Sequence, residues 1–197
     1  MQNFPFTHNG QELWYSRSLA VSLCTFAAKV DENDKLHVYV LANMRGPGAE
    51  FNKYMWNVPG GFIDFNENAE TCGTRETFEE TGVIVDKSKI FFNILDTNPT
   101  SGRQTMLASY FTYVDDIDKA KSQFSLDNCK PGEAIAIKFI DVTEIGKYRW
   151  TRNQKQFIIM CLKKFIEQEL YSHLNICSGK EEFENILFQT ILSSNNQ

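Results

Sequence analysis

The chain has 197 residues, of which 42% are hydrophobic and 23% are charged, an ordinary globular composition with enough length for one domain with a hydrophobic core. Its net charge is −5, its sequence pI is about 5.3, and it has no long lysine or arginine run. We therefore expect no nucleic-acid partner held by broad electrostatic attraction. No apolar run approaches the length of a membrane span, so we expect a soluble protein with no membrane partner.

The five cysteines are widely separated and form no C-x-x-C pair. An odd number at such spacing favours reduced thiols over disulfides or a zinc site, which indicates a cytosolic protein. The N-terminal segment has neither a basic start nor the apolar stretch of a signal peptide. We therefore predict a cytoplasmic location.

The first part of the chain reads as strands. Residues 1–16 are polar and aromatic without a clear period, and we expect an entry strand or a loop. Residues 18–30 and 36–44 are strand-like runs. Residues 31–34, Asp-Glu-Asn-Asp, have the composition of a hairpin turn, so the two runs are predicted to pair.

Three more strands are predicted in the middle of the chain, over residues 84–95, 106–114 and 134–140. Residues 115–132 are acidic and then polar, and they contain Pro131-Gly132. We predict a long loop there, which is often a sign of function or mobility.

Two helices are predicted in the C-terminal part. Thr151 and Gln154 form a capping box, and apolar residues recur at helical spacing over residues 157–166, which indicates a helix packed on the sheet. Ser178 and Glu181 likewise predict a cap for a second amphipathic helix. That helix either packs on its own domain or contacts a second subunit, so a homodimer is possible. Together the elements predict an α+β fold with a mixed sheet clasped by helices.

The residues that carry chemistry lie in residues 61–83, GFIDFNENAETCGTRETFEETGV. The second half of this segment is predicted to be helical, and Glu76, Glu79 and Glu80 then share one helical face. Stacked like charges are mildly destabilising in water, and a bound divalent cation would remove the conflict. Mg²⁺ or Mn²⁺ prefers carboxylate oxygens and phosphate oxygens, so the pattern indicates diphosphate chemistry.

The ends of this helix are also marked in the sequence. Asn66 or Asn68 can serve as the N-cap, and Gly82 suits a left-handed residue just past the last turn. Glu67 lies at the junction between loop and helix. Arg75 is four residues before Glu79, a spacing at which it can orient one carboxylate.

These residues resemble the signature of the Nudix hydrolases, G-x5-E-x7-R-E-U-x-E-E-x-G-U, where U is a bulky aliphatic residue. One departure is Thr77 at the first U position, which we interpret as a packing variation that leaves the metal ligands in place. A second is Cys72 with Gly73, where many members have alanines. Trp56-Asn57-Val58-Pro59-Gly60-Gly61 resembles the family's W-x-x-P-G-G lead-in. The matching positions are Gly61, Glu67, Arg75, Glu76, Glu79, Glu80, Gly82 and Val83.

The resemblance covers about residues 18–170 and implies an α/β/α sandwich. We predict a Nudix hydrolase domain over residues 1–171 and a C-terminal helical extension over residues 172–197. The resemblance also implies a metal site for one to three Mg²⁺ ions, with Mn²⁺ as the alternative. Its residues would be Gly61, Glu67, Glu76, Glu79 and Glu80, with Arg75 orienting a glutamate.

Four residues outside the signature are weaker candidates. Some Nudix enzymes carry a glutamate at the spacing of Glu133 that binds metal or acts as a base, but an exposed loop glutamate is the alternative. Pro99 lies near the position of a proline typical of ADP-ribose pyrophosphatases, although a simple turn proline is an equal interpretation. Arg45 and Arg103 could each contact a substrate phosphate or lie on the surface.

The sequence therefore predicts a metal-dependent pyrophosphohydrolase with Glu79 or Glu133 as the base. Its substrate would be a nucleoside diphosphate linked to another group, with ADP-ribose first and a nucleoside triphosphate second. The rival hypothesis is a Nudix module that senses a nucleotide without cutting it. All the glutamates of the signature are present and no DNA-binding helix-turn-helix is recognisable, which argues against the rival.

Overall fold

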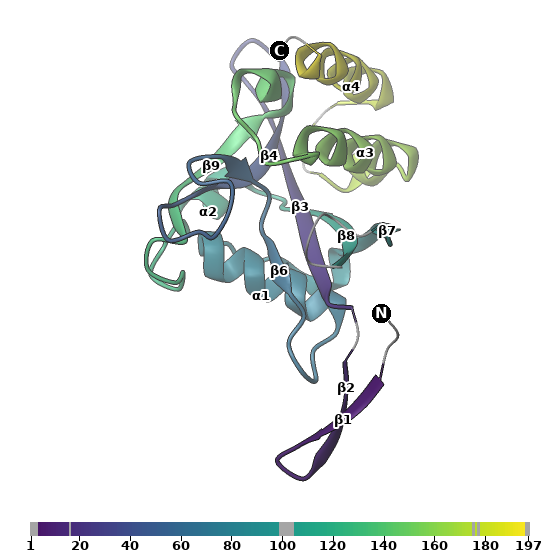
Figure 1. Cartoon of the computed structure of the whole chain (residues 1–197). Helices are drawn as coiled ribbons and strands as arrows, with labels where there is room; N and C mark the ends of the chain where they lie inside the picture. Colours follow the sequence, from purple (N-terminus) through teal and green to yellow (C-terminus); the bar gives the residue numbers. More distant parts are fainter. Residues whose placement is uncertain (1–3, 16, 99–104, 175, 177, 196–197) are drawn as a thin grey trace.

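The fold is built around β3, a twelve-residue strand at the centre of a mixed sheet (Figure 1). The computed structural model describes residues 4–15, 17–98, 105–174, 176 and 178–195. Its strands are β1 (Phe4–His8), β2 (Gln11–Tyr15), β3 (Leu19–Val30), β4 (Leu36–Arg45), β5 (Trp56–Asn57), β6 (Gly60–Phe62), β7 (Phe91–Asp96), β8 (Met106–Tyr113) and β9 (Ala134–Asp141).

The described residues form four α-helices and three short 3-10 turns. The α-helices are α1 (Ala69–Thr81), α2 (Ile117–Lys121), α3 (Gln154–Glu167) and α4 (Lys180–Ser194). Short 3-10 turns are η1 (Lys87–Lys89), η2 (Val142–Lys147) and η3 (Leu170–His173). None of the helices in the described ranges is long and apolar enough to cross a membrane.

The sheet has the order β5-β4-β3-β8-β7, with β6 paired to β3 and β9 paired to β4. β3 and β4 form the predicted antiparallel hairpin, whereas β3 and β8 run parallel. Both faces of β3 are buried, as expected for a central strand with a nearly continuous apolar sequence. Mixed pairing around a buried strand confirms the predicted fold class.

Successive residues of β3 pack on opposite layers. Leu23 and Ala27 join the cluster that contains Val83 and α2, on the side of α1, while Cys24 and Phe26 join the cluster of α3 and α4. The sheet therefore lies between α1 with α2 on one face and α3 with α4 on the other (Figure 1). This is the sandwich that the family resemblance implied.

The C-terminal helix α4 packs on its own chain, which answers the question that the sequence left open. Phe183 is fully buried, with its ring centroid 5.2 Å from that of Tyr171 and 6.1 Å from that of Phe165. The predicted cap was misplaced by one residue, because Glu182, and not Glu181, accepts the hydrogen bond from the N-cap N–H, at Gly179.

The predicted capping box of α3 is also wrong. The N-cap is Asn153, whose φ of 63° makes the left-handed turn into the helix. Thr151 instead donates to the Asn57 side chain at 2.8 Å, and the Gln154 side chain accepts from the N–H of Val58 at 3.3 Å. The two side chains therefore join α3 to the segment that precedes β6.

Two further predictions need correction. The strand predicted over residues 84–95 begins only at Phe91, because the Asp86 side chain accepts from Ser88 N–H and closes a short turn. The loop predicted over residues 115–132 contains α2, which is capped by Asp116. Residues 4–15 form a separate hairpin of β1 and β2 that extends away from the sandwich (Figure 1).

Replacing Phe183 by alanine should lower the free energy of unfolding by about 3–5 kcal/mol, because it removes a fully buried ring between α3 and α4. Phe188 lies on the same helix but is 62% exposed, so Phe188→Ala should change stability by about 0.5 kcal/mol or less. Urea unfolding of the two variants measures the difference. Equal losses would show that α4 does not pack as described.

Candidate active site

A pocket of about 680 Å³ opens between α1, the loop after β4 and the turn before β9. It gathers residues of both charge signs from parts of the chain that are far apart in sequence. Its charged lining residues are Arg45, Glu50, Asp64, Arg75, Glu76, Glu79, Glu80, Lys130 and Glu133.

The helix α1 carries three of these glutamates, and its ends agree with the sequence prediction. Asn68 is the N-cap and accepts from Thr71 N–H at 2.9 Å. Gly82 follows the last turn with a φ of 76°, and its N–H donates to the carbonyl of Phe78. An alanine at position 82 would be strained by this φ and would lie 2.3 Å from the Gln123 carbonyl oxygen.

Glu80 is the most buried carboxyl group of the pocket, with 4% of the residue exposed. It accepts one hydrogen bond from Gly60 N–H, at 3.1 Å. Burial, together with the nearby charge of Glu76, raises the pKa of Glu80 to about 8. Burial also raises the pKa of Glu76, although Arg75 opposes that shift. The pocket therefore disfavours the ionised form of two adjacent carboxyl groups.

Arg75 connects the helix to the loop before it. Its Nε and Nη2 atoms each donate to one carboxylate oxygen of Glu67 at 2.9 Å, a bidentate pair that lowers the pKa of Glu67. Its Nη1 donates to Glu76 at 2.7 Å and to Glu79 at 3.2 Å. The predicted Arg75–Glu79 pair is present, but Glu67 is the stronger partner. Glu67 thus lies beside Arg75 and does not line the pocket.

Two glycines bring the lead-in segment against its neighbours. A Cβ atom on Gly61 would lie 2.2 Å from the nearest carboxylate oxygen of Glu76, and one on Gly60 would lie 2.3 Å from the carbonyl oxygen of Val21. Larger residues at either position would have to displace the helix carboxylate or the central strand. The glycines therefore allow β6 to lie between β3 and the carboxylates of α1.

Glu133 reaches the pocket from the opposite wall. Its carbonyl accepts from Gly46 N–H at 2.7 Å, and the preceding Gly132 accepts from Gly48 N–H, also at 2.7 Å. Gly132 has a φ of 76°, so this turn suits glycine. The structure thus places Glu133 in the same pocket as Glu76, Glu79 and Glu80.

The other candidates divide into two groups. Arg45, the last residue of β4, lines the pocket and lies close enough to Glu80 for its charge to oppose the rise in that residue's pKa. Its Nε donates to the carbonyl of Phe51 at 2.9 Å. Pro99 and Arg103 lie outside the described residues, so the structure does not place them.

The carboxylates do not stand in a preformed metal cage. Among the residues that the structure describes, no group of three or more acidic, histidine or cysteine side chains is arranged to hold a metal ion. Arg75 accounts for this, because it hydrogen-bonds Glu76 and Glu79 itself. The donor set nevertheless fits a hard cation, since carboxylate oxygens are its preferred ligands and a cation would neutralise the buried Glu80.

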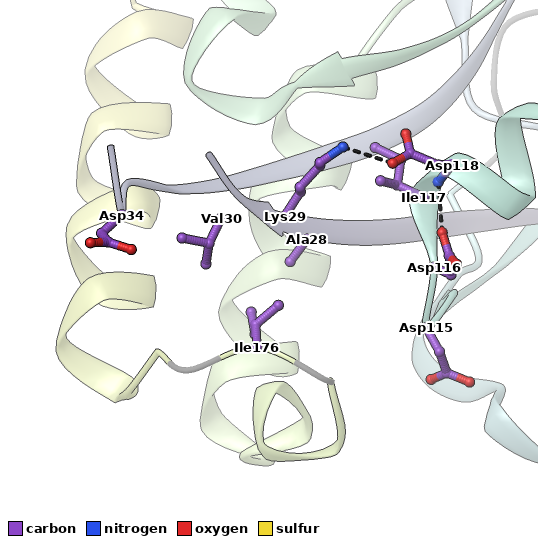
Figure 2. Close-up of a pocket in the computed structure, with 9 residues that line it drawn as sticks. All are labelled: Ala28, Lys29, Val30, Asp34, Asp115, Asp116, Ile117, Asp118 and Ile176. Carbon is purple, nitrogen blue, oxygen red and sulfur yellow. Dashed lines mark hydrogen bonds and ion pairs between the residues drawn. The ribbon is translucent and has the colours of Figure 1, made fainter. Parts of the chain in front are cut away.

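A second hollow, of about 700 Å³, is slightly larger but offers no comparable chemistry (Figure 2). Three of its four aspartates already have structural partners. Asp118 pairs with Lys29 at 2.7 Å, Asp115 pairs with Lys89 at 2.6 Å, and Asp116 caps α2. The pocket at α1 is therefore the candidate active site.

Comparison with known proteins shows the family of the chain. The sequence model of the NUDIX domain matches residues 24–161, about two thirds of the chain. The chain belongs to the NUDIX family. The family resemblance predicted from residues 61–83 is thereby confirmed. Five residues of the signature line the pocket described above, namely Gly61, Arg75, Glu76, Glu79 and Glu80.

Solved structures share the Nudix fold at low sequence identity. A MutT/nudix family protein from Enterococcus faecalis is 18% identical, with a TM-score of 0.59 over 80% of this chain and 66% of that chain. NrtR from Shewanella oneidensis is 15% identical, with a TM-score of 0.61 over 89% and 77%. An Ap4A hydrolase from C. elegans is 15% identical, with a TM-score of 0.54 over 77% and 98%. At this identity the likeness shows the fold alone.

NrtR has also been solved as its NUDIX domain with ADP ribose and as the protein with a 27mer DNA. A Nudix relative of this fold can thus bind DNA, so the predicted absence of a nucleic-acid partner has no support from these neighbours.

Replacing Arg75 by alanine should lower the free energy of unfolding by about 2 kcal/mol, because it leaves Glu67 and Glu76 without their charged partner. Arg75→Lys should recover only part of the lost free energy of unfolding, since lysine cannot form a bidentate pair with a carboxylate. The exposed pair of Lys29 with Asp118 provides the control, and Lys29→Ala should change stability far less than Arg75→Ala, because water screens the exposed charges. Chemical denaturation measures all three variants; a loss in Arg75→Ala no larger than in the control would contradict the assignment.

Without divalent metal, stability should fall as the pH rises from about 4.5 to about 8. The folded protein keeps a proton on Glu80 that the unfolded chain has already lost in this window, so ionisation favours unfolding. Glu80→Gln stays neutral, so it should lose about 5 °C less in melting temperature than the wild type between pH 6 and pH 8.5. Thermal scans in a chelator measure this, with Glu70→Gln on the same helix as the control. Parallel pH curves for wild type and Glu80→Gln would show that Glu80 is not protonated in the folded state.

Proposed function

We propose that this protein is a metal-dependent pyrophosphohydrolase. It would hydrolyse the diphosphate linkage of a nucleoside diphosphate joined to another group, giving a nucleoside monophosphate and a second phosphorylated product. The observation that carries the proposal is that four glutamates line one pocket, namely Glu76, Glu79, Glu80 and Glu133. These carboxyl groups come from two opposite walls, and one of them is held in its protonated form by burial.

The acidic residues would hold Mg²⁺, or Mn²⁺, as a cofactor. Glu76, Glu79 and Glu80 are the proposed ligands from α1, with the backbone at Gly61 beside them, and Glu133 is either a further donor or the base. When bound, the metal supplies positive charge to the diphosphate oxygens and lowers the pKa of the attacking water. Glu67 would act indirectly, because it fixes Arg75, and Arg75 in turn orients Glu76 and Glu79.

Glu133 is our preferred base. The carboxylate of Glu79 is engaged by Arg75, whereas no hydrogen bond or ion pair holds the Glu133 side chain within the described part of the chain. A base must be free to accept the proton of the attacking water, and catalytic groups are often carried on loops. Arg45 would contact a substrate phosphate from the end of β4.

ADP-ribose, or a similar nucleotide derivative, is the proposed substrate. The pocket volume of about 680 Å³ suits a small molecule of this size. The likeness to the NrtR domain that was solved with ADP ribose gives this ligand first place. A (d)NTP or a dinucleotide is the second possibility, in view of the likeness to an Ap4A hydrolase. A cytoplasmic location belongs to the same proposal.

A nucleotide-sensing module is the alternative function. The likeness to NrtR, which was solved with DNA, favours this possibility. A sensor would bind the nucleotide in the same pocket and leave it intact. The complete set of Nudix glutamates supports the hydrolase instead.

Purified protein with Mg²⁺ should release product from at least one member of a panel of ADP-ribose, dinucleotides, nucleotide sugars and (d)NTPs. Glu79→Gln, Glu80→Gln and Glu133→Gln should each lower kcat by about 100-fold or more, because each removes a proposed ligand or the base. Chromatography of the products measures turnover and identifies the bond that is cut.

Glu70→Gln is the matched control, since Glu70 lies on α1 outside the pocket. Its turnover should equal that of the wild type. No turnover of any compound, together with a rise in melting temperature on addition of ADP-ribose, would replace the hydrolase by the sensor.

A further inference from the structure

Two phenylalanine rings stand at the acidic pocket, which is an unusual place for exposed apolar groups. Phe51 belongs to the loop between β4 and β5 and is 56% exposed, while Phe62 ends β6 and is 45% exposed. Both line the pocket with the glutamates. Exposed apolar side chains are common singly, but two aromatic rings beside one charged pocket suggest a ligand with a flat apolar surface.

The backbone carbonyl of each phenylalanine accepts a hydrogen bond from an arginine of the same pocket. The carbonyl of Phe51 accepts from Arg45 Nε at 2.9 Å, and the carbonyl of Phe62 accepts from Arg75 Nη2 at 3.0 Å. Both arginines also line the pocket. The backbone that carries each ring is therefore tied to an arginine with a role in the proposed function, Arg45 toward a phosphate and Arg75 toward the glutamates.

The loop that carries Phe51 has a defined and strained backbone. Asn52 and Tyr54 have φ values of 54° and 61°, in the left-handed region that a bulky residue such as tyrosine rarely adopts. Backbone hydrogen bonds at 2.7 and 3.0 Å join Arg45 to Tyr54 and Met55 and close the loop. Strain of this kind persists where the surrounding structure enforces it, and it is concentrated at ligand-binding segments.

The same loop is clamped to the opposite wall of the pocket. The N–H groups of Gly46 and Gly48 donate to the carbonyls of Glu133 and Gly132. A Cβ atom at either donor glycine would approach this turn at 3.0 Å or less. The loop is therefore joined by its backbone to the turn that carries Glu133, and Phe51 and Glu133 line the same pocket.

We propose that Phe51 and Phe62 bind the nucleobase of the substrate by stacking. This inference rests on the proposed function, since it places the nucleobase beside the diphosphate that Arg45 and the metal held by the carboxylates would bind. Every nucleobase has an aromatic face, so the two rings select substrates that carry a base without choosing strongly among bases. The pocket thus distinguishes a nucleotide from a simple phosphate ester or inorganic diphosphate.

The test compares Phe51→Leu with Phe65→Leu, using the nucleotide that the wild type turns over. Phe65 is 89% exposed and does not line the pocket, so it is a matched control for the loss of one ring. Phe51→Leu should raise KM about tenfold with kcat changed by about twofold or less, because stacking contributes to binding. Phe51→Tyr should restore KM, and Phe65→Leu should leave it unchanged.

Inorganic diphosphate, used as a competitive inhibitor, separates stacking from a general distortion of the pocket. It has no base, so its inhibition constant should be the same in Phe51→Leu and wild type. An equal weakening of diphosphate and nucleotide would overturn the proposal, and so would an unchanged KM in both Phe51→Leu and Phe62→Leu. Melting temperatures of all variants confirm that they are folded.

Failure of this inference can be distinguished from failure of the proposed function. If the wild type cleaves no nucleotide, the hydrolase proposal is refuted. The stacking proposal can still be tested, because calorimetry then measures the Kd of ADP-ribose for wild type, Phe51→Leu and Phe65→Leu. A Kd that rises about tenfold in Phe51→Leu and not in Phe65→Leu supports stacking in a sensor. Equal Kd values in wild type and Phe51→Leu overturn the stacking proposal.

Discussion

The guanidinium group of Arg75 determines how the acidic helix can exist in this fold. Glu76, Glu79 and Glu80 place like charges on neighbouring turns of α1, which destabilises an isolated helix. Arg75 bonds two of them and reaches back to Glu67, so it offsets the repulsion and fixes the loop before the helix. The planar guanidinium has five N–H donors, so it can bind Glu67 in a bidentate pair and still donate to Glu76 and Glu79, whereas an ammonium group has only three donors and no bidentate geometry.

The contact between α1 and the sheet is close and partly polar. A Cβ atom on Gly73 would lie 3.4 Å from side-chain atoms of Leu23, so the helix passes very near β3. Thr77, one turn further, is fully buried, and its hydroxyl donates to the Gly73 carbonyl at 2.8 Å. The departure from an aliphatic residue therefore leaves no unmet donor on the helix. Thr25 and Thr112 pair in register between β3 and β8, and their buried hydroxyls have no hydrogen bond among the described residues.

Local signals were sufficient to predict α1 and most strands. Asn68 and Gly82 each act within one turn of the helix end that they define, and the buried runs of β3 and β8 need no distant information. One local signal in the sequence was overlooked. Asn9-Gly10, with φ values of 50° and 79°, is a common hairpin turn and marks the β1–β2 hairpin in a segment predicted only as a strand or loop.

Tertiary contacts explain the remaining differences. Thr151 and Gln154 have the spacing of a capping box, yet their side chains bond to residues 57 and 58, far away in the sequence. Glu133 could be nominated from spacing, but its place opposite α1 depends on hydrogen bonds from Gly46 and Gly48. Phe51 belongs to no sequence motif. Its position at the pocket depends on how the loop between β4 and β5 folds, so it could not be predicted from the sequence.

Burial of Glu80 links metal binding to proton release. A carboxyl group with a pKa of about 8 is mostly protonated at neutral pH, and a cation can bind its oxygens fully only when that proton leaves. Cation affinity should therefore increase with pH over the range in which Glu80 ionises. Nucleotide recognition alone does not require such a group, because neutral donors and acceptors suffice for a base and a sugar. A buried acid that accepts from Gly60 N–H and lies near the charges of Glu76 and Arg45 therefore suits a pocket that holds a cation, as the proposed function requires.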